Sequence, residues 1–232
     1  MSIAQNIETT ASTVHPVTPD VSSQFEHPIS CPPTNLYSDE PPLETSLHLQ
    51  QMMMLISCLN WLWRNQDHYF AAGNLTVYYN ENQLKSKDYR GPDFFVVLGT
   101  EKKPRKSWVV WEEGGKYPNI IVELLSESTS QVDRGAKKEI YQDIFRTPDY
   151  FWFDPDSLEF AGFHLLDGTY EALKPNEQGW LWSQQLGLFL GVQDDLLRFF
   201  TPERQLVLSP EEENERLAAK LRELGVDPDA LT

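Results

Sequence analysis

Two carboxylates and one lysine stand among apolar residues in the middle of this 232-residue sequence. Glu123 interrupts the apolar run NIIVELL, residues 119–125, and Asp93 begins the apolar run DFFVVL, residues 93–98. A carboxylate buried in such a run costs several kcal/mol unless a neighbouring group compensates its charge. Lys137 follows on the next predicted helix, so we expect the three side chains to form one polar site.

The chemistry expected of this site is metal-dependent hydrolysis of a phosphodiester. Oxygen ligands from Asp93, Glu123 and a nearby backbone carbonyl suit a hard divalent cation such as Mg²⁺ or Mn²⁺. Lys137 beside the cation would position the attacking water and offset charge on a phosphoryl oxygen, while the metal polarises the phosphodiester. The cation would also compensate the buried charge of Glu123.

Other interpretations of these residues stay open. Asp93 follows a Gly-Pro pair and fits a turn, and Glu123 with Lys137 fits a buried ion pair that needs no metal. A two-carboxylate glycosidase explains Asp93 and Glu123 but leaves the lysine without a role. The five histidines show no metal-ligand spacing, and His48 on the first helix is a secondary candidate for the edge of the pocket.

The helix predicted over residues 134–146 determines which way Lys137 points. At about 100° per residue, an apolar stripe forms on one face from Ile140, Tyr141, Ile144 and Phe145. Lys137 lies near the centre of this stripe and Lys138 about a quarter turn away, so one lysine faces inward and the other faces water. Asp133 either caps this helix or pairs with Lys137.

The order of the predicted elements indicates the fold class. A helix over 43–65 is followed by short β-type runs at 75–79, 93–98, 107–111 and 119–125, which suggest a meander. After the second helix come a strand at 149–155 and a hairpin that turns at Asp167 and Gly168. This pattern favours an α+β or mixed α/β layer fold over a doubly wound parallel sheet.

The flanks of this core give the predicted domain organisation. Residues 1–42, rich in Ser, Thr and Pro, form a mostly disordered arm, and residues 43–205 form one catalytic-size domain. Residues 206–232 form a helix and tail, capped by Ser209 and stopped at Gly225. This C-terminal helix is a candidate contact for a partner or for a homo-oligomer.

Composition restricts the compartment and the partners. The two cysteines show no pairing pattern, and there is no signal peptide or membrane-spanning run, so a reduced, cytoplasmic protein is expected. The net charge is −16, yet residues 85–138 hold eleven Lys or Arg against eight Asp or Glu. This local excess of +3, against −19 elsewhere, is compatible with a polyanion such as DNA, although EKKPRK, residues 101–106, also fits a solvated loop.

Several of these stretches, taken in order, resemble a known family. GPD (91–93), IIVELLS (120–126) and DRGAKKEIY (133–141) are similar to the PD-(D/E)xK nuclease superfamily, in the version whose lysine lies on the helix. With YFWFDP (150–155) and the tail RLAAKLRELGVDPD (216–229), the chain more closely resembles the bacterial Uma-two-type family of restriction-endonuclease-like proteins. The resemblance implies a restriction-endonuclease-like core, a central mixed sheet flanked by helices, and a DNA endonuclease.

The resemblance also implies roles for individual residues. Asp93 and Glu123 would bind the metal, Leu124 would offer its backbone carbonyl, and Lys137 would be the catalytic lysine. The superfamily more often carries this lysine two positions after the glutamate, where this chain has Leu125. Activity therefore depends on Lys137 acting from the helix.

A further acid and a second function follow from the same resemblance. The first core helix of this superfamily often adds another acid, for which Glu44 is the best positional candidate, with Glu40 close by. The alternative function is a catalytically silent interaction module that keeps the nuclease fold and works through its C-terminal helix. The acidic composition and the lack of a separate DNA-reading domain favour that alternative.

Overall fold

The structure, a computed structural model, describes residues 33–40, 45–80, 91–126 and 133–228. The chain divides into two compact units, Met1–Cys31 and Pro32–Thr232, and all described residues belong to the second. Most of the predicted N-terminal arm therefore lies outside the described residues.

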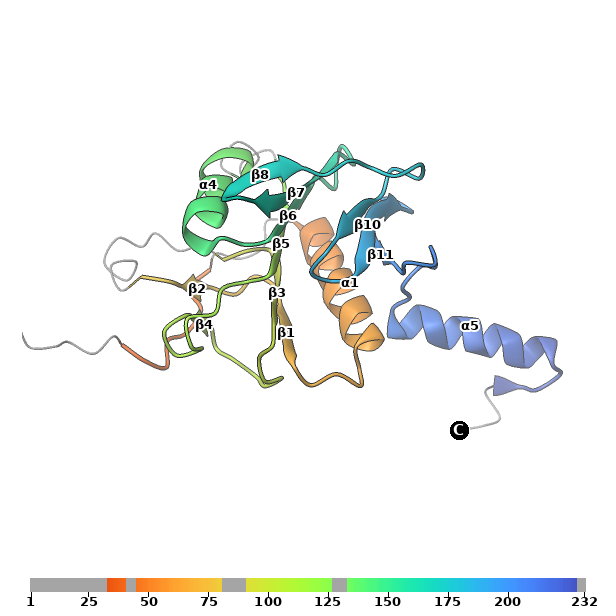
Figure 1. Ribbon diagram of the computed structural model, residues 1–232. Helices are drawn as coiled ribbons and strands as arrows, with labels where there is room; N and C mark the ends of the chain where they lie inside the picture. Colours follow the sequence, from red (N-terminus) through yellow and green to blue (C-terminus); the bar gives the residue numbers. More distant parts are fainter. Residues whose placement is uncertain (1–32, 41–44, 81–90, 127–132, 229–232) are drawn as a thin grey trace, which may run out of the picture. The chain divides into compact units, whose positions relative to one another are not determined.

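A six-stranded mixed sheet forms the centre of this unit (Figure 1). Its two central strands, β5 and β6, run parallel, and every other neighbouring pair in the sheet is antiparallel. In spatial order the strands are β1 (Tyr69–Ala72), β3 (Phe94–Leu98), β5 (Ile120–Leu124), β6 (Asp149–Phe153), β7 (Phe160–Leu166) and β8 (Thr169–Ala172). The fold is thus the predicted α+β class, with a central mixed sheet flanked by helices.

The predicted meander is wrong. The runs at 75–79 and 107–111 form β2 (Val77–Tyr78) and β4 (Trp108–Val109), which pair with each other in parallel as a separate two-stranded sheet. The branched and aromatic residues of these runs predicted that they form strands, but residue types do not tell which strand pairs with which. β1, which was not predicted, takes the edge of the main sheet beside β3.

Each face of the main sheet is covered by its own apolar cluster. Helix α1 (Ser46–Leu62) packs on the face that carries Phe94 and Val122. The alternate residues Phe95 and Ile121 belong to the second cluster, together with side chains of the helical segment 133–145. This alternation follows from the side-chain period of two along a strand, and it directs Glu123 toward the helical segment.

A second antiparallel sheet completes the α1 side of the core. Its strands are β9 (Leu181–Ser183), β10 (Leu188–Gln193) and β11 (Leu196–Phe200). Gln51 of α1, fully buried, donates to the Leu197 carbonyl at 2.9 Å and accepts from the Leu197 N–H at 2.8 Å. A polar residue in the apolar stripe of α1 thus holds the helix to this sheet through two buried hydrogen bonds.

The helix expected over 134–146 has wider turns than an α-helix. Asp133–Lys137 and Tyr141–Phe145 form π-type turns, and only α4 (Lys138–Ile140) between them is α-helical. The widened turns bring residues four apart into line, so Lys137, Tyr141 and Phe145 point inward. Ile144, placed in the apolar stripe by α-helical geometry, is instead exposed. Such π-type turns occur often at functional sites.

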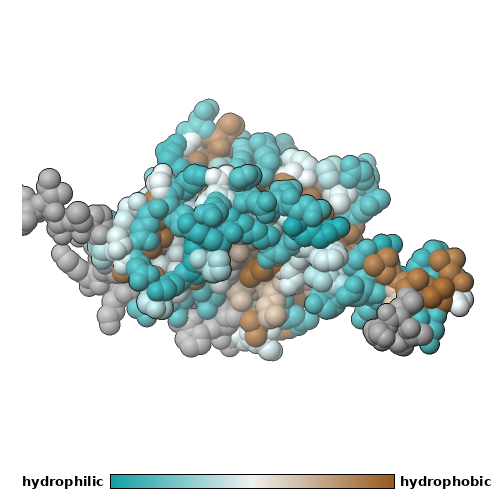
Figure 2. All heavy atoms as spheres, turned by 90° about the horizontal axis from the view of Figure 1, so that it is seen from below, coloured by the Kyte–Doolittle hydropathy of each residue, from teal (hydrophilic) through white to brown (hydrophobic). Residues whose placement is uncertain are grey.

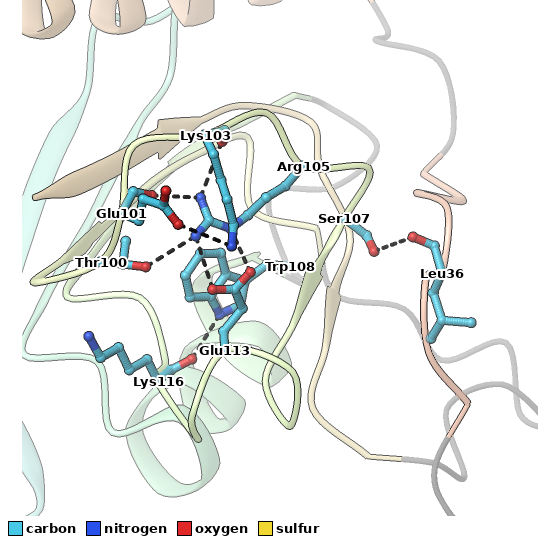
Figure 3. A network of polar contacts seen from close by, with 9 residues as sticks. All are labelled: Leu36, Thr100, Glu101, Lys103, Arg105, Ser107, Trp108, Glu113 and Lys116. Carbon is cyan, nitrogen blue, oxygen red and sulfur yellow. Dashed lines mark hydrogen bonds and ion pairs between the residues drawn. The ribbon is translucent and has the colours of Figure 1, made fainter. Parts of the chain in front are cut away.

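Arg105 shows that the basic segment 101–106 is not simply a solvated loop (Figure 3). Its guanidinium donates to both carboxylate oxygens of Glu113, at 2.6 and 3.0 Å, and lies over the rings of Phe70 and Trp108. The Arg105 side chain is only 4% exposed, and its hydrogen bond holds the pKa of Glu113 below the usual range. The charge of Arg105 is therefore used inside the fold.

The predicted C-terminal helix forms as α5 (Pro210–Glu223). Ser209 is the cap, as predicted, and it forms a capping box with Glu212, in which each side chain accepts from the backbone N–H of the other. Glu212 also accepts two hydrogen bonds from the buried guanidinium of Arg198 in β11, at 3.0 and 2.6 Å. One carboxylate therefore starts the helix and fastens it to the core.

We expect Glu212→Ala to lower the free energy of unfolding by about 2 kcal/mol or more, because it leaves the Arg198 charge buried without its partner and removes a cap. Glu213→Ala is the matched control, since Glu213 pairs with Arg216 at the surface and its loss should change stability little. Urea denaturation of both variants measures the difference. Equal effects would show that Glu212 does not secure the helix.

Candidate active site

The pairing of β3 with β5 brings two of the candidate residues together. Phe94 lies opposite Val122 in the antiparallel register, so Asp93, just before β3, reaches the end of β5. The Leu124 N–H donates to Asp93 Oδ2 at 2.7 Å. The two carboxylates therefore come from neighbouring strands of one sheet, as a single polar site requires.

Glu123 is the buried centre of the site. Its side chain has no exposed surface, and its Oε2 atom lies 3.1 Å from Lys137 Nζ. The hydroxyl of Tyr141, also buried, donates to Oε1 at 2.5 Å. Tyr141 was expected only as an apolar stripe residue; its spacing of four from Lys137 was the signal that it shares the lysine's direction.

The surroundings of Glu123 disfavour its ionised form. Burial raises the pKa of Glu123 to about 7, and the neighbouring Asp93 acts in the same direction, against the lowering effects of Lys137 and Tyr141. One lysine therefore does not fully compensate two adjacent carboxyl groups in this partly dry environment. Additional positive charge at this position would favour the ionised form of Glu123.

The backbone of Leu124 is held on both sides. Its N–H bonds Asp93, and its carbonyl lies 3.1 Å from His48 Nε2. Because a carbonyl only accepts, Nε2 of the buried His48 carries a hydrogen, and Nδ1 contacts the Thr45 hydroxyl at 2.8 Å. His48 thus lies at the edge of the site, where it was placed from the sequence, and it also fixes the carbonyl expected to bind metal.

The donor set is that of a hard cation. Asp93 and Glu123 supply carboxylate oxygens. The Leu124 carbonyl oxygen has two lone pairs, and its hydrogen bond with His48 uses one of them. Within the described ranges, no group of three or more His, Cys, Asp or Glu side chains is arranged to hold a metal ion. Two carboxylates, one carbonyl and water are nevertheless ligands of the kind that Mg²⁺ prefers.

The predicted further acid, Glu44, lies outside the described residues. Glu40 is described, and it lies close enough for the charges of Lys137 and Glu123 to affect it. Of the two acids named from the sequence, Glu40 is the one with a described position, and it lies near the other three residues.

Comparison with known proteins gives the family. The family model named Uma2, with the description "Putative restriction endonuclease", matches residues 36–198, more than half of the chain. This chain belongs to the Uma2 family. The match spans Glu40, Asp93, Glu123 and Lys137, so the whole candidate site of this Uma2 protein lies inside it.

The other comparisons add less to this assignment. A solved structure similar to the Uma2 protein is titled "Crystal structure of a putative nuclease belonging to DUF820 from Anabaena variabilis ATCC 29413 at 1.96 A resolution". Its TM-score is 0.47 at 15% sequence identity, and the similarity covers 62% of this chain and 76% of that one. No curated protein matches the chain. Among the described segments, no helix is long and apolar enough to cross a membrane.

The raised pKa of Glu123 predicts how stability depends on pH without divalent metal. Between about pH 4.5 and 7 the folded protein holds a proton on Glu123 that the unfolded chain releases, so stability is full below this window and falls as pH rises through it. The loss amounts to at most about 3 kcal/mol. Thermal melts in EDTA from pH 4.5 to 8 measure it.

Glu123→Gln should remove this decline, because glutamine has no proton to lose. Glu203→Gln, at an exposed carboxylate, is the matched control and should keep the wild-type profile. The same slope in Glu123→Gln as in the wild type would show that Glu123 does not titrate in this range.

Proposed function

We propose that this Uma2-family protein is a divalent-metal-dependent endonuclease that hydrolyses DNA phosphodiester bonds with a metal-activated water. The observation that carries the proposal is the buried Glu123 carboxylate, held between Lys137 and Tyr141 beside a second carboxyl group, Asp93. This arrangement leaves negative charge to be compensated at one place. Family membership supports the same reaction class, because the family's description is that of a restriction endonuclease.

In this proposal the strand ends hold the cation. Asp93, Glu123 and the Leu124 carbonyl are its protein ligands, and Mg²⁺ or Mn²⁺ suits this oxygen set. When bound, the cation polarises the phosphodiester and lowers the pKa of its bound water. His48 keeps the Leu124 carbonyl in place through the 3.1 Å contact from Nε2.

The helical segment supplies the other polar groups. Tyr141 fixes the orientation of the Glu123 carboxylate by donating to Oε1, while Lys137 lies at Oε2. The Lys137 ammonium orients the attacking water and stabilises the negative charge that develops on a phosphoryl oxygen. Because Lys137 is on the helical segment, position 125 can carry a leucine, which is fully buried.

One observation favours the alternative, an interaction module that acts through its C-terminal helix. Leu217 of α5 and the following Leu224 and Val226 are exposed, at 47%, 70% and 39%. Figure 2 shows apolar surface on this helix, away from the body of the described unit. Exposed apolar residues of this kind are typical of a contact surface for a partner or a second copy.

Nicking of supercoiled plasmid DNA in Mg²⁺ or Mn²⁺ tests the endonuclease. We expect Glu123→Gln and Lys137→Ala each to lower the rate at least about 100-fold, the usual effect of losing a group that stabilises transition-state charge. EDTA should abolish nicking, and excess Mn²⁺ should restore it.

Lys138→Ala is the matched control for the lysine. Its ammonium lies 3.4 Å from the centre of the Phe163 ring, not at Glu123, so its removal should leave the rate nearly unchanged. Equal losses in the two lysine variants would contradict the assigned site. If the wild-type protein neither nicks DNA nor gives a heat of Mn²⁺ binding, the endonuclease proposal is wrong. The interaction module then explains the protein better.

A further inference from the structure

The C-terminal helix α5 carries an apolar face that its own chain leaves exposed. None of the residues of Pro210–Glu223 is buried, and the helix extends away from the sheets (Figure 1). Leu217 and Leu224 are exposed, and Leu221 is half-buried. Because the intervals between these leucines are four and three residues, they lie on one face of the helix, as in the seam of a coiled coil.

A second exposed apolar surface lies at the start of this helix. A groove between α1 and α5 is lined by Leu49, Met53 and Met54 of α1, by Ser209, the cap of α5, and by Glu211 in its first turn. Leu49 is 44% exposed and Met53 is 55% exposed. A helix with apolar residues on its outer face as well as its inner face is normally covered on both. The groove therefore favours a covering element from outside this subunit.

The charges of α5 are divided along its length. Its first turn contains Glu211, Glu212 and Glu213, and its last turn contains Lys220 and Arg222. This division suits the dipole of a single helix, and it also distinguishes the ways in which two copies pair. In a parallel pair like charges meet at each end, whereas in an antiparallel pair each acidic end lies beside a basic end. Charge therefore favours antiparallel pairing of α5 with a second copy of itself.

We propose that this protein forms a two-fold symmetric dimer in which the two α5 helices pack antiparallel about Leu217. In this register Leu224 of one helix lies opposite Pro210 of the other, next to the groove that Ser209 lines. The C-terminal end of each helix, with Leu224 and the exposed Val226, then covers the groove of the second copy. Each apolar surface is buried twice, as a two-fold interface requires. The inference goes beyond the proposed function and does not depend on it.

The groove and the helix face are both needed for a stable interface. Such an interface buries about 800 Å² on each partner, which is more than three leucines on one short helix supply. The exposed Leu49 and Met53 add apolar area where the second copy of α5 ends. At the edge of the pair, Glu213 of one helix lies beside Lys220 of the other, and charges of this kind fix the orientation more than they add affinity.

Sedimentation equilibrium of the full-length protein in EDTA measures the dimer without involving metal or DNA. Leu217→Asp should weaken the dimer about 100-fold, because it removes one buried leucine from each subunit and each is worth about tenfold. Met53→Asp in the groove should also weaken it. Leu166→Asp is the matched control, because Leu166 is exposed to a similar degree, 50% against 47%, but lies on β7. Because all three residues are exposed, the core of each subunit stays intact.

Cysteine cross-linking tests the antiparallel register in a Cys31→Ser background, where the remaining Cys58 is buried. A short bismaleimide should join two copies of Leu217→Cys, because this position lies at the two-fold axis. It should not join two copies of Leu224→Cys, because these positions lie about 20 Å apart in an antiparallel pair. In a parallel pair both variants would be joined.

The outcomes decide between a second copy and other occupants of this surface. A protein that stays monomeric at every concentration would refute the dimer and leave the surface to a different partner. Equal affinities of Leu217→Asp and Leu166→Asp would place the interface elsewhere, and an unchanged affinity of Met53→Asp would refute the contact in the groove. Cross-linking of both cysteine variants would refute the antiparallel register. None of these results bears on nicking, so the endonuclease is tested separately.

Discussion

The burial of the Glu123 carboxylate is the constraint on which the rest of this structure depends. A carboxyl group without exposed surface is tolerated only where donors and positive charge meet it at fixed positions. The helical segment 133–145 meets this requirement by directing an ammonium and a phenol to the two oxygens. The hydrogen-bonding needs of one buried carboxylate on β5 therefore determine how the helical segment 133–145 packs on the sheet.

The mixed sheet places this group next to the polar end of a central strand. β5 lies between an antiparallel and a parallel neighbour and is covered on both faces, so its side chains are buried from solvent. Polar groups gather where the strand ends. At this end, Asp93 accepts from the Leu124 N–H and His48 contacts the Leu124 carbonyl. Contacts from two other segments thus orient the backbone of Leu124, including its carbonyl.

Sequence reasoning worked where the determining interaction is local. Alternation along the strand placed Glu123 on one face, and the position of Lys137 in an apolar stripe predicted that it points inward. Pairing of β2 with β4 could not be derived, because edge choice depends on residues far apart in the chain. The contact of His48 with Leu124 joins residues 76 positions apart in the chain, so no local pattern predicts it. The widened helical turns replaced the α-helical geometry that placed Ile144 inside.

The widened turns also determine which side chains of this segment can face the sheet together. On a regular α-helix, residues four apart lie about 40° from one another around the axis, so Phe145 would turn well away from the direction of Lys137. The π-type turns counteract this rotation. Tyr141 and Phe145 therefore both pack in the apolar cluster on the face to which Lys137 points.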